Sequence, residues 1–100
     1  MLHNIGLAQE FIHGHTLRTL QADARTLYAI VRSLEIISEA SRRVSDAVKA
    51  RHPHIAWREM AAAGNFYRHE YEDVSARRVW NTLRDHLPAL RAAIEQELAD

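Results

Sequence analysis

Residues that interrupt helices are scarce in this chain. In 100 residues, glycine occurs only at positions 6, 14 and 64, and proline only at positions 53 and 88. Glycine weakens a helix through its backbone freedom, and proline does so because it lacks an N–H. The stretches between them are rich in Ala, Leu, Arg and Glu, which favour helices. We therefore predict an all-α fold, an up-and-down bundle of four to five helices that forms one domain over residues 1–100.

The longest apolar pattern predicts the central helix of this bundle. The helix starts after Thr16 or Asp23, and its apolar residues recur at the i, i+3, i+4, i+7 spacing of one face: Leu27, Ile30, Val31, Leu34, Ile37, Val44 and Val48. Small residues fill the stripe after Ile37, and we expect them to let another helix approach closely: Ser38, Ala40 and Ser41. Ile36 lies off the stripe, so it is a candidate for contact with a second surface.

Two further helices flank this one in the sequence. The N-terminal helix is expected from Leu2 to His13, with Gly14 at its C-terminal cap. The opening lacks an obvious capping residue, which leaves open a start upstream of Met1. Pro53 disfavours helical geometry in the residue before it, so the central helix ends before this position. A third helix is then expected from Trp57 to Tyr71.

The last helix is expected from about Ala76 to the C-terminal region. Its apolar face is formed by Val79, Trp80, Leu83, Leu87, Leu90, Ile94 and Leu98. Pro88 lies inside this pattern and should bend the helix about one turn upstream, near Arg84 or Asp85. Trp57 and Trp80 could stack on nucleic-acid bases, but positions in the core of the bundle are expected for both.

Charge and composition exclude several classes of function. The 13 Lys and Arg residues balance 13 Asp and Glu residues, so nucleic-acid binding would need a local basic patch. A chain near zero net charge also resists self-association weakly. The chain has no cysteine, which excludes disulfides, thiolate zinc sites and a cysteine nucleophile. Neither a signal peptide nor an apolar stretch of ~20 residues is found, so a cytoplasmic protein without a membrane span is expected.

The stretch "GNFYRHEY", residues 64–71, concentrates the chemically versatile side chains. On a helix, Asn65 and His69 share one face, and Gly64 and Arg68 share a neighbouring face. His69 can exchange a proton near neutral pH, and Arg68 is a permanent cation suited to a phosphate. Such groups could serve metal-free RNA cleavage. A solvated helix face with no catalytic role is the alternative on spacing alone.

The other histidines give weaker signals. His52 and His54 flank Pro53 and could suggest a metal pair, but no third histidine lies beside them and no acidic residue is closer than Glu59. "HGHT", residues 13–16, is explained by a loop at the end of a helix. We therefore predict no metal site and no cofactor.

Four segments together resemble a known family. "RSLEIISEASRRV", "RHPHIAWREMAAAGN", "HEY" and "VWNTLRDHLPAL" occur in the order and spacing typical of the HepT-like toxins of the HEPN superfamily, and the similarity runs from about Asn4 to Glu95. The resemblance implies a HEPN-like helical bundle that forms a homodimer with its active cleft at the dimer interface. It also implies metal-independent RNA cleavage by the toxin of a type VII toxin–antitoxin pair.

The resemblance assigns roles to individual residues. The polar residue of the family motif corresponds to Asn65, the acid/base histidine to His69 and the following tyrosine to Tyr71. The antitoxin partner of such toxins is a MntA-type nucleotidyltransferase, which can neutralise the toxin by transferring AMP to that tyrosine. Tyr71 is therefore the expected modification site, and the RNA and the nucleotidyltransferase are the expected partners.

The sequence departs from the family motif at position 64, where Gly64 replaces the motif arginine. Arg68 lies one turn further on, and long helical side chains lean toward the N-terminus, so Arg68 is the first candidate for the missing cation. A surface pair with Glu72 is the alternative for Arg68, and Arg42 or Arg43 across the dimer are alternative cations. Two functions follow: an RNA-cleaving toxin, or a catalytically weakened HEPN protein that dimerises and binds the antitoxin. Glu35 and Glu39 could act in the cleft or in dimer pairing, although a solvated face is expected.

Overall fold

The computed structural model describes residues 1–65 and 72–99, with side chains described for 1–64 and 76–99. These residues form seven α-helices and one short 3-10 helix, with no strand among them. In chain order the elements are α1 (Leu2–Ile12), α2 (Leu17–Gln21), α3 (Ala24–Arg42), α4 (Asp46–Arg51), α5 (Trp57–Ala62), η1 (Ala63–Asn65), α6 (Glu72–Asp85) and α7 (Leu87–Ala99). The predicted all-α fold is confirmed.

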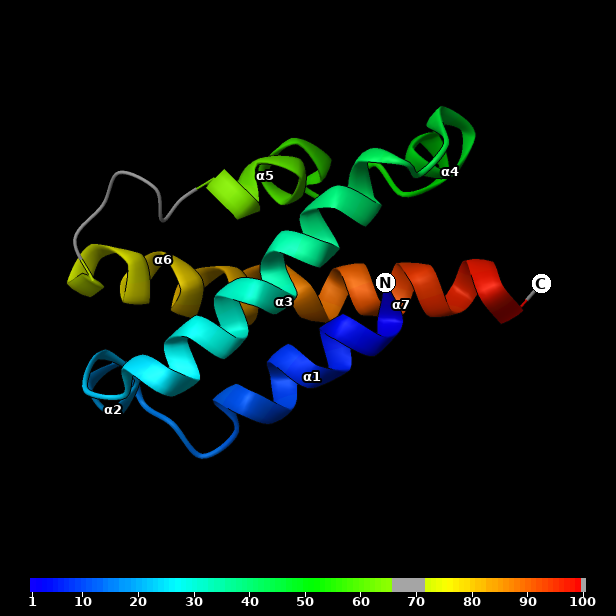
Figure 1. The fold of residues 1–100 in the computed structure, drawn as a ribbon. Coiled ribbons are helices and arrows are strands. Elements are labelled where there is room, and N and C mark those ends of the chain that lie inside the picture. Colours follow the sequence, from blue (N-terminus) through cyan, green and yellow to red (C-terminus); the bar gives the residue numbers. More distant parts are fainter. Residues whose placement is uncertain (66–71, 100) are drawn as a thin grey trace.

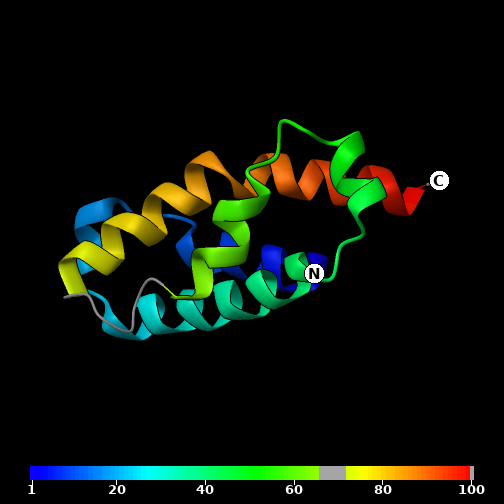
Figure 2. The same ribbon diagram turned by 90° about the horizontal axis from the view of Figure 1, so that it is seen from above.

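Helix α3 is the central element of the bundle. In Figure 1, α1 lies on one side of α3 and α5 lies on the other, while α6 and α7 follow one another behind them. Seen from above, α6 and α7 form one row and α3 another, and α5 lies across the space between the rows (Figure 2). The apolar stripe of α3 supplies fully or almost fully buried core residues: Leu27, Ile30, Leu34 and Ile37. The other elements add fully buried residues to the same core cluster: Ile5, Leu20, Met60, Val79, Leu87 and Leu90.

The long predicted helix is divided into three helices by its own capping residues. Thr16 starts α2 through a capping box with Thr19, and Asp23 starts α3 by accepting a bond from the Thr26 N–H at 3.0 Å. Both predicted start points are therefore real, and each begins a different helix. The prediction of one helix through Val48 is wrong, because α3 ends at Arg42 and Ser45 caps the separate helix α4.

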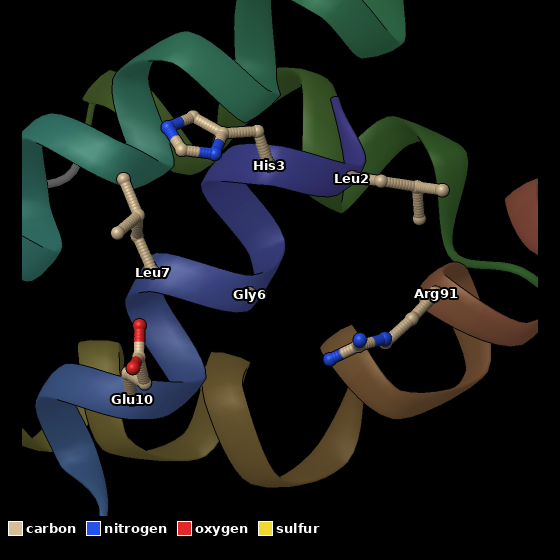
Figure 3. A pocket seen from close by; sticks show the side chains of 6 residues that line it. All are labelled: Leu2, His3, Gly6, Leu7, Glu10 and Arg91. Atoms are coloured by element: carbon tan, nitrogen blue, oxygen red, sulfur yellow. The ribbon is translucent and has the colours of Figure 1, made fainter.

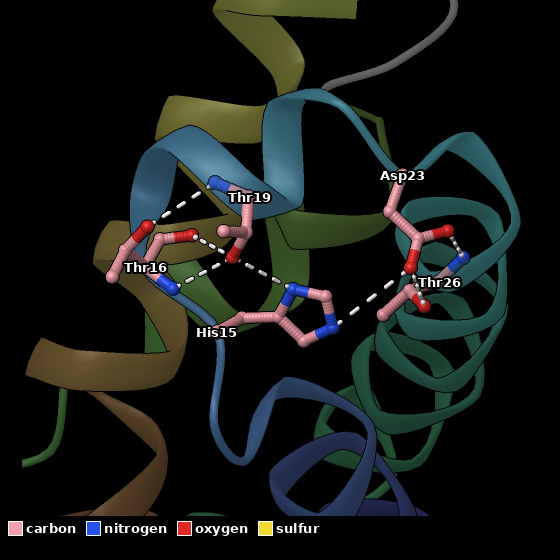
Figure 4. A network of polar contacts seen from close by, with 5 residues as sticks. All are labelled: His15, Thr16, Thr19, Asp23 and Thr26. Atoms are coloured by element: carbon pink, nitrogen blue, oxygen red, sulfur yellow. Dashed lines mark hydrogen bonds and ion pairs between the residues drawn. The ribbon is translucent and has the colours of Figure 1, made fainter.

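A polar network joins the starts of α2 and α3. Nδ1 of His15 lies 3.0 Å from the Thr19 hydroxyl, and its Nε2 lies 3.9 Å from the Asp23 carboxylate (Figure 4). The hydrogen bonds from Thr26 lower the pKa of Asp23 below its usual value. His15 thus belongs to a loop between helices, as predicted for "HGHT", and Gly14 provides the turn with a φ of 82°.

The C-terminal half agrees with the predicted effect of Pro88. The last predicted helix is interrupted at His86, which lies between α6 and α7. This position is within two residues of the predicted bend. Pro88 occupies the first turn of α7, where its missing N–H costs no helical bond. Helix α6 begins at Glu72, four residues earlier than predicted.

The third predicted helix begins at Trp57, as expected. It is shorter than predicted, because α5 ends at Ala62 and is followed by the 3-10 turn η1, which ends at Asn65. Residues 66–71 lie outside the described residues.

A carboxylate clamp joins the end of α4 to the end of α7. Glu97 accepts from Arg51 through both oxygens, and its Oε2 also accepts from Nε2 of His52 at 2.8 Å. His52 is 4% exposed, and its carbonyl accepts from the Trp57 indole N–H at 3.0 Å. The bonds from Arg51 and His52 lower the pKa of Glu97 from 4.5 to about 2. The clamp fixes the loop that leads into α5.

The described residues contain no helix long and apolar enough to cross a bilayer. In the part of the chain that the structure covers, the exposed large apolar side chains are Phe11, Tyr28 and Leu98. They lie on three different helices, α1, α3 and α7.

Acid should weaken the fold through Glu97. Because its folded pKa lies below the ordinary value, the clamp contributes fully to stability above pH 4.5, and the contribution is lost as the pH falls toward 2. We expect Glu97→Gln to lower the free energy of unfolding at pH 7, and the deficit to shrink in acid. Urea titrations at several pH values measure this difference.

Glu95→Gln is the matched control for the clamp, because Glu95 lies on the same helix but pairs with Arg91 at the exposed surface. We expect this variant to stay close to the wild type at every pH. A Glu97→Gln deficit that remained constant between pH 7 and pH 3 would contradict the role of the clamp.

Candidate functional site

The predicted catalytic residues begin at Asn65, directly after residues 61–64, which contact α3. Asn65 is the last residue of η1, and its side chain is not among those described. His69, Arg68 and Tyr71 lie outside the described residues. The geometry of the candidate site is therefore built from α3, α5 and η1, which determine where residues 61–65 lie.

Two side chains of α3 bind one carbonyl of α5. The hydroxyl of Ser38 donates to the carbonyl oxygen of Ala61 at 2.6 Å, and Nη2 of Arg42 donates to the same oxygen at 2.7 Å. Ala61 belongs to the last turn of α5, where carbonyl groups begin to lack partners within their own helix. The C-terminal end of α5 is thus capped by α3, and its position is fixed just before Gly64 and Asn65.

Gly64 packs directly on α3. A Cβ atom at this position would lie 3.4 Å from the Cα of Glu35 and 3.4 Å from both Cβ and Oγ of Ser38. The side-chain direction of position 64 therefore faces the backbone of α3 and not open solvent. This contact confirms that the small residues of α3 admit a close neighbour, and it shows that α3 occupies the space a larger residue at position 64 would use.

The exposed face of α3 carries alternating charges. Arg32 pairs with Glu35 at 3.3 Å, while Glu39 pairs with Arg42 at 3.4 Å and with Arg43 at 3.1 Å. A shallow groove runs along this face and is lined by Arg32, Glu35, Ile36, Glu39, Ala40 and Arg43. Glu35 and Glu39 thus pair with arginines of their own helix, as a solvated face would do, and Ile36 lies at the surface of the groove.

The remaining candidates have structural roles. Trp57 and Trp80 pack partly buried against the core, as predicted, and the guanidinium of Arg84 lies 5.7 Å from the Trp80 ring centroid. The rings of His52 and His54 are in edge contact at 5.9 Å, but His52 is bonded to Glu97. Within the described residues, no three His, Asp or Glu side chains gather into a group that could hold a metal ion.

A second groove lies over α1 and α7, on the other side of α3 from α5. It is lined by Leu2, His3, Gly6, Leu7, Glu10 and Arg91 (Figure 3). The Arg91 guanidinium is already bonded to Gln9 and Glu95. The groove is wide and contains none of the residues that the sequence assigns to catalysis.

Sequence reasoning did not assign the bonds to Ala61. It identified Ser38 as a small residue at a close approach and Arg42 as an alternative cation across a dimer. It could not show that both side chains point to the same carbonyl, because Ala61 lies 23 and 19 residues away from them. The small-residue stripe of α3 was the signal that could have located this contact.

Comparison with known proteins identifies the family. The family described as Ribonuclease HepT-like matches residues 1–97 of this chain. A protein of Thermococcus cleftensis named as a probable ribonuclease HepT is 36% identical over 92 residues, which cover 92% of this chain and 84% of the relative. The chain therefore belongs to the HepT-like ribonuclease family, a member of the HEPN superfamily.

More distant relatives carry similar names. A protein of Caldanaerobacter subterraneus subsp. tengcongensis named as a candidate RNase is 30% identical over 89 residues, covering 89% of this chain and 80% of the relative. A similarly named protein of Methanocaldococcus jannaschii is 29% identical over 86 residues, covering 86% of this chain and 71% of the relative. No solved structure was found to match the chain significantly.

The contact at position 64 predicts how glycine substitutions will behave. Gly64→Ala should make ordinary contacts with α3 and restrict the unfolded chain, so we expect the free energy of unfolding to rise by about 0.4–1 kcal/mol. Gly14→Ala is the contrasting variant, because its φ of 82° strains an L-residue and should cost about 1–2 kcal/mol. Chemical denaturation measures both changes. If Gly64→Ala destabilised the chain as strongly as Gly14→Ala, the described packing at position 64 would be wrong.

Proposed function

We propose that this chain is a HepT-like toxin that cleaves RNA without a metal ion. The observation that supports this proposal most directly is the match to the HepT-like ribonuclease family over residues 1–97. The motif positions Asn65, His69 and Tyr71 fall inside this match. The packing of Ala61 and Gly64 on α3 supports it further, since a catalytic segment must start from a fixed backbone.

The proposed chemistry is a phosphoryl transfer within the RNA strand. His69 exchanges the protons, as the base that accepts the proton of the ribose 2′-OH or as the acid that protonates the leaving oxygen. The 2′ oxygen attacks the adjacent phosphorus, and the bond to the leaving oxygen breaks. Asn65 positions the ribose or the imidazole. Arg68 stabilises the negative charge of the pentacoordinate phosphorane in place of the arginine that Gly64 replaces.

The proposed partners follow from the family. The chain acts as a homodimer with its cleft between two subunits, in the cytoplasm where its RNA substrates are found. A MntA-type nucleotidyltransferase serves as the antitoxin of this type VII pair. Light scattering at micromolar concentration should give twice the mass of one chain, and a monomer mass would contradict the dimer.

A second function is favoured by one specific observation. Gly64 provides no cation where the family motif has one, which fits a catalytically weakened HEPN protein that dimerises and binds the antitoxin. The two functions differ in a single measurable property, the cleavage of RNA by the purified protein.

RNA cleavage should depend on His69 and Arg68. We expect His69→Ala to reduce the rate by about 10²–10⁴, because it removes the proton-transferring group. Arg68→Ala should reduce the rate by about 10²–10³, because it removes an electrostatic contact to the phosphorane. Initial rates on labelled RNA measure these effects in metal-chelated buffer.

Two results would overturn this assignment. Unchanged cleavage by Arg68→Ala would mean that the cation comes from another residue. A wild type that dimerises and binds the antitoxin but cleaves no RNA would establish the second function.

Tyr71 should accept AMP from the antitoxin. With a cognate nucleotidyltransferase and ATP, the phenol oxygen attacks the α-phosphorus, and pyrophosphate leaves. The adduct places a phosphate and a bulky base two residues from His69, and so should block an RNA phosphate by charge and volume. Intact mass spectrometry should find one added AMP on the wild type and none on Tyr71→Phe. An adduct that persisted in Tyr71→Phe would assign the modification elsewhere.

A further inference from the structure

The two arginines that end α3 lie in different environments. Arg42 donates to the Ala61 carbonyl at 2.7 Å and lies 3.4 Å from a Glu39 oxygen, and its side chain is 48% exposed. Arg43 bonds the same carboxylate at 3.1 Å, and its side chain is 78% exposed. Of the two, Arg42 is the one that reaches α5. The Arg42 side chain thus combines a bond to α5 with partial exposure.

The charges at this end of α3 do not cancel. Glu39 is the one carboxylate in the described ion pairs of Arg42 and Arg43, so two guanidinium groups share a single negative charge. The other partner of Arg42, the Ala61 carbonyl, carries no formal charge. Arg43 can keep Glu39 paired while Arg42 contacts an anion. An anion that approaches Arg42 therefore need not displace the bond to Ala61, because only the contact with Glu39 competes with it.

The position of Arg42 relates this charge to the candidate site. Ala61 lies three residues before Gly64 and four before Asn65 in the sequence. Gly64 has no side chain, and its side-chain direction faces Glu35 and Ser38 of α3. Position 64 therefore places no charged group of its own here, and Arg42 brings one to the same short segment from another helix.

We propose that Arg42 binds a phosphate of the RNA backbone next to the segment 61–65. This assignment rests on the proposed function and adds a substrate-binding residue to it. A guanidinium offers forked donors that fit two phosphate oxygens, and its charge persists at every physiological pH. The bond to Ala61 holds the group in place before RNA arrives, so less conformational freedom is lost on binding.

RNA binding by matched variants tests this assignment. Arg42→Gln and Arg43→Gln each remove one positive charge beside Glu39, but only Arg42 is bonded to α5. The probe is a fluorescein-labelled single-stranded RNA of mixed sequence, titrated at several salt concentrations. The titrations use His69→Ala protein so that cleavage does not interfere.

The expected result separates the two arginines. Arg42→Gln should weaken RNA binding about 10-fold, as expected for one charge-assisted hydrogen bond. It should also reduce the slope of log affinity against log salt by about 0.7, the share of one phosphate contact in a single strand. Arg43→Gln should leave this slope unchanged. Equal slopes for Arg42→Gln and the parent protein, or an equal reduction by Arg43→Gln, would overturn the assignment.

Two further variants separate phosphate binding from the capping of α5. Ser38→Ala removes the other bond to Ala61 but no charge, so it should lower the melting temperature and leave the salt slope unchanged. Arg42→Lys keeps the charge without the fork, so it should retain the slope with weaker binding. If Arg42→Gln does not fold, Arg42→Lys decides instead, and binding as tight as that of the parent protein would overturn the assignment. A wild type that binds RNA through Arg42 but cleaves none would contradict the proposed function alone.

Discussion

The carbonyl group of Ala61 is the point on which the arrangement of the candidate segment depends. A helix that ends inside a protein leaves carbonyl oxygens without partners, and burying them unpaired is costly. Here α3 supplies both partners, a hydroxyl from Ser38 and a guanidinium from Arg42. Gly64 packs on the same surface of α3, against Glu35 and Ser38. The central helix α3 therefore fixes the position of the backbone that leads to Asn65.

Much of the fold could be predicted from local patterns. The stripe of Leu27, Ile30, Leu34 and Ile37 marks α3 because its spacing matches one face of a helix, and all four are buried. Thr16 and Asp23 were alternative starts for one predicted helix, and in the structure each caps a helix of its own. The separation of α4 from α3 was missed, because the apolar spacing continues through Val44 and Val48 while Ser45 starts a new helix. The spacing of apolar residues does not show whether a residue such as Ser45 continues one long helix or starts a new one.

The candidate site was less predictable than the fold, and the reason is distance along the chain. The identity of Asn65, His69 and Tyr71 follows from the family motif, which is a property of sequence alone. The support around them comes from α3, through contacts that join residues 19 and 23 positions apart. Gly64 illustrates the difference. In the sequence Gly64 stands for a missing charge, whereas in the structure it also allows η1 to pack against Glu35 and Ser38 of α3.

The clamp at Glu97 has a consequence for the order of folding. It joins His52 and Arg51 to a residue 45 and 46 positions further along, and so closes a loop that contains α5, η1, α6 and most of α7. Closing a long loop costs chain entropy that only the final contacts repay. Local helix pairs such as α6 with α7 can form without this closure. We therefore expect the contacts of Glu97 with Arg51 and His52 to form late in folding, after helices close in sequence have paired.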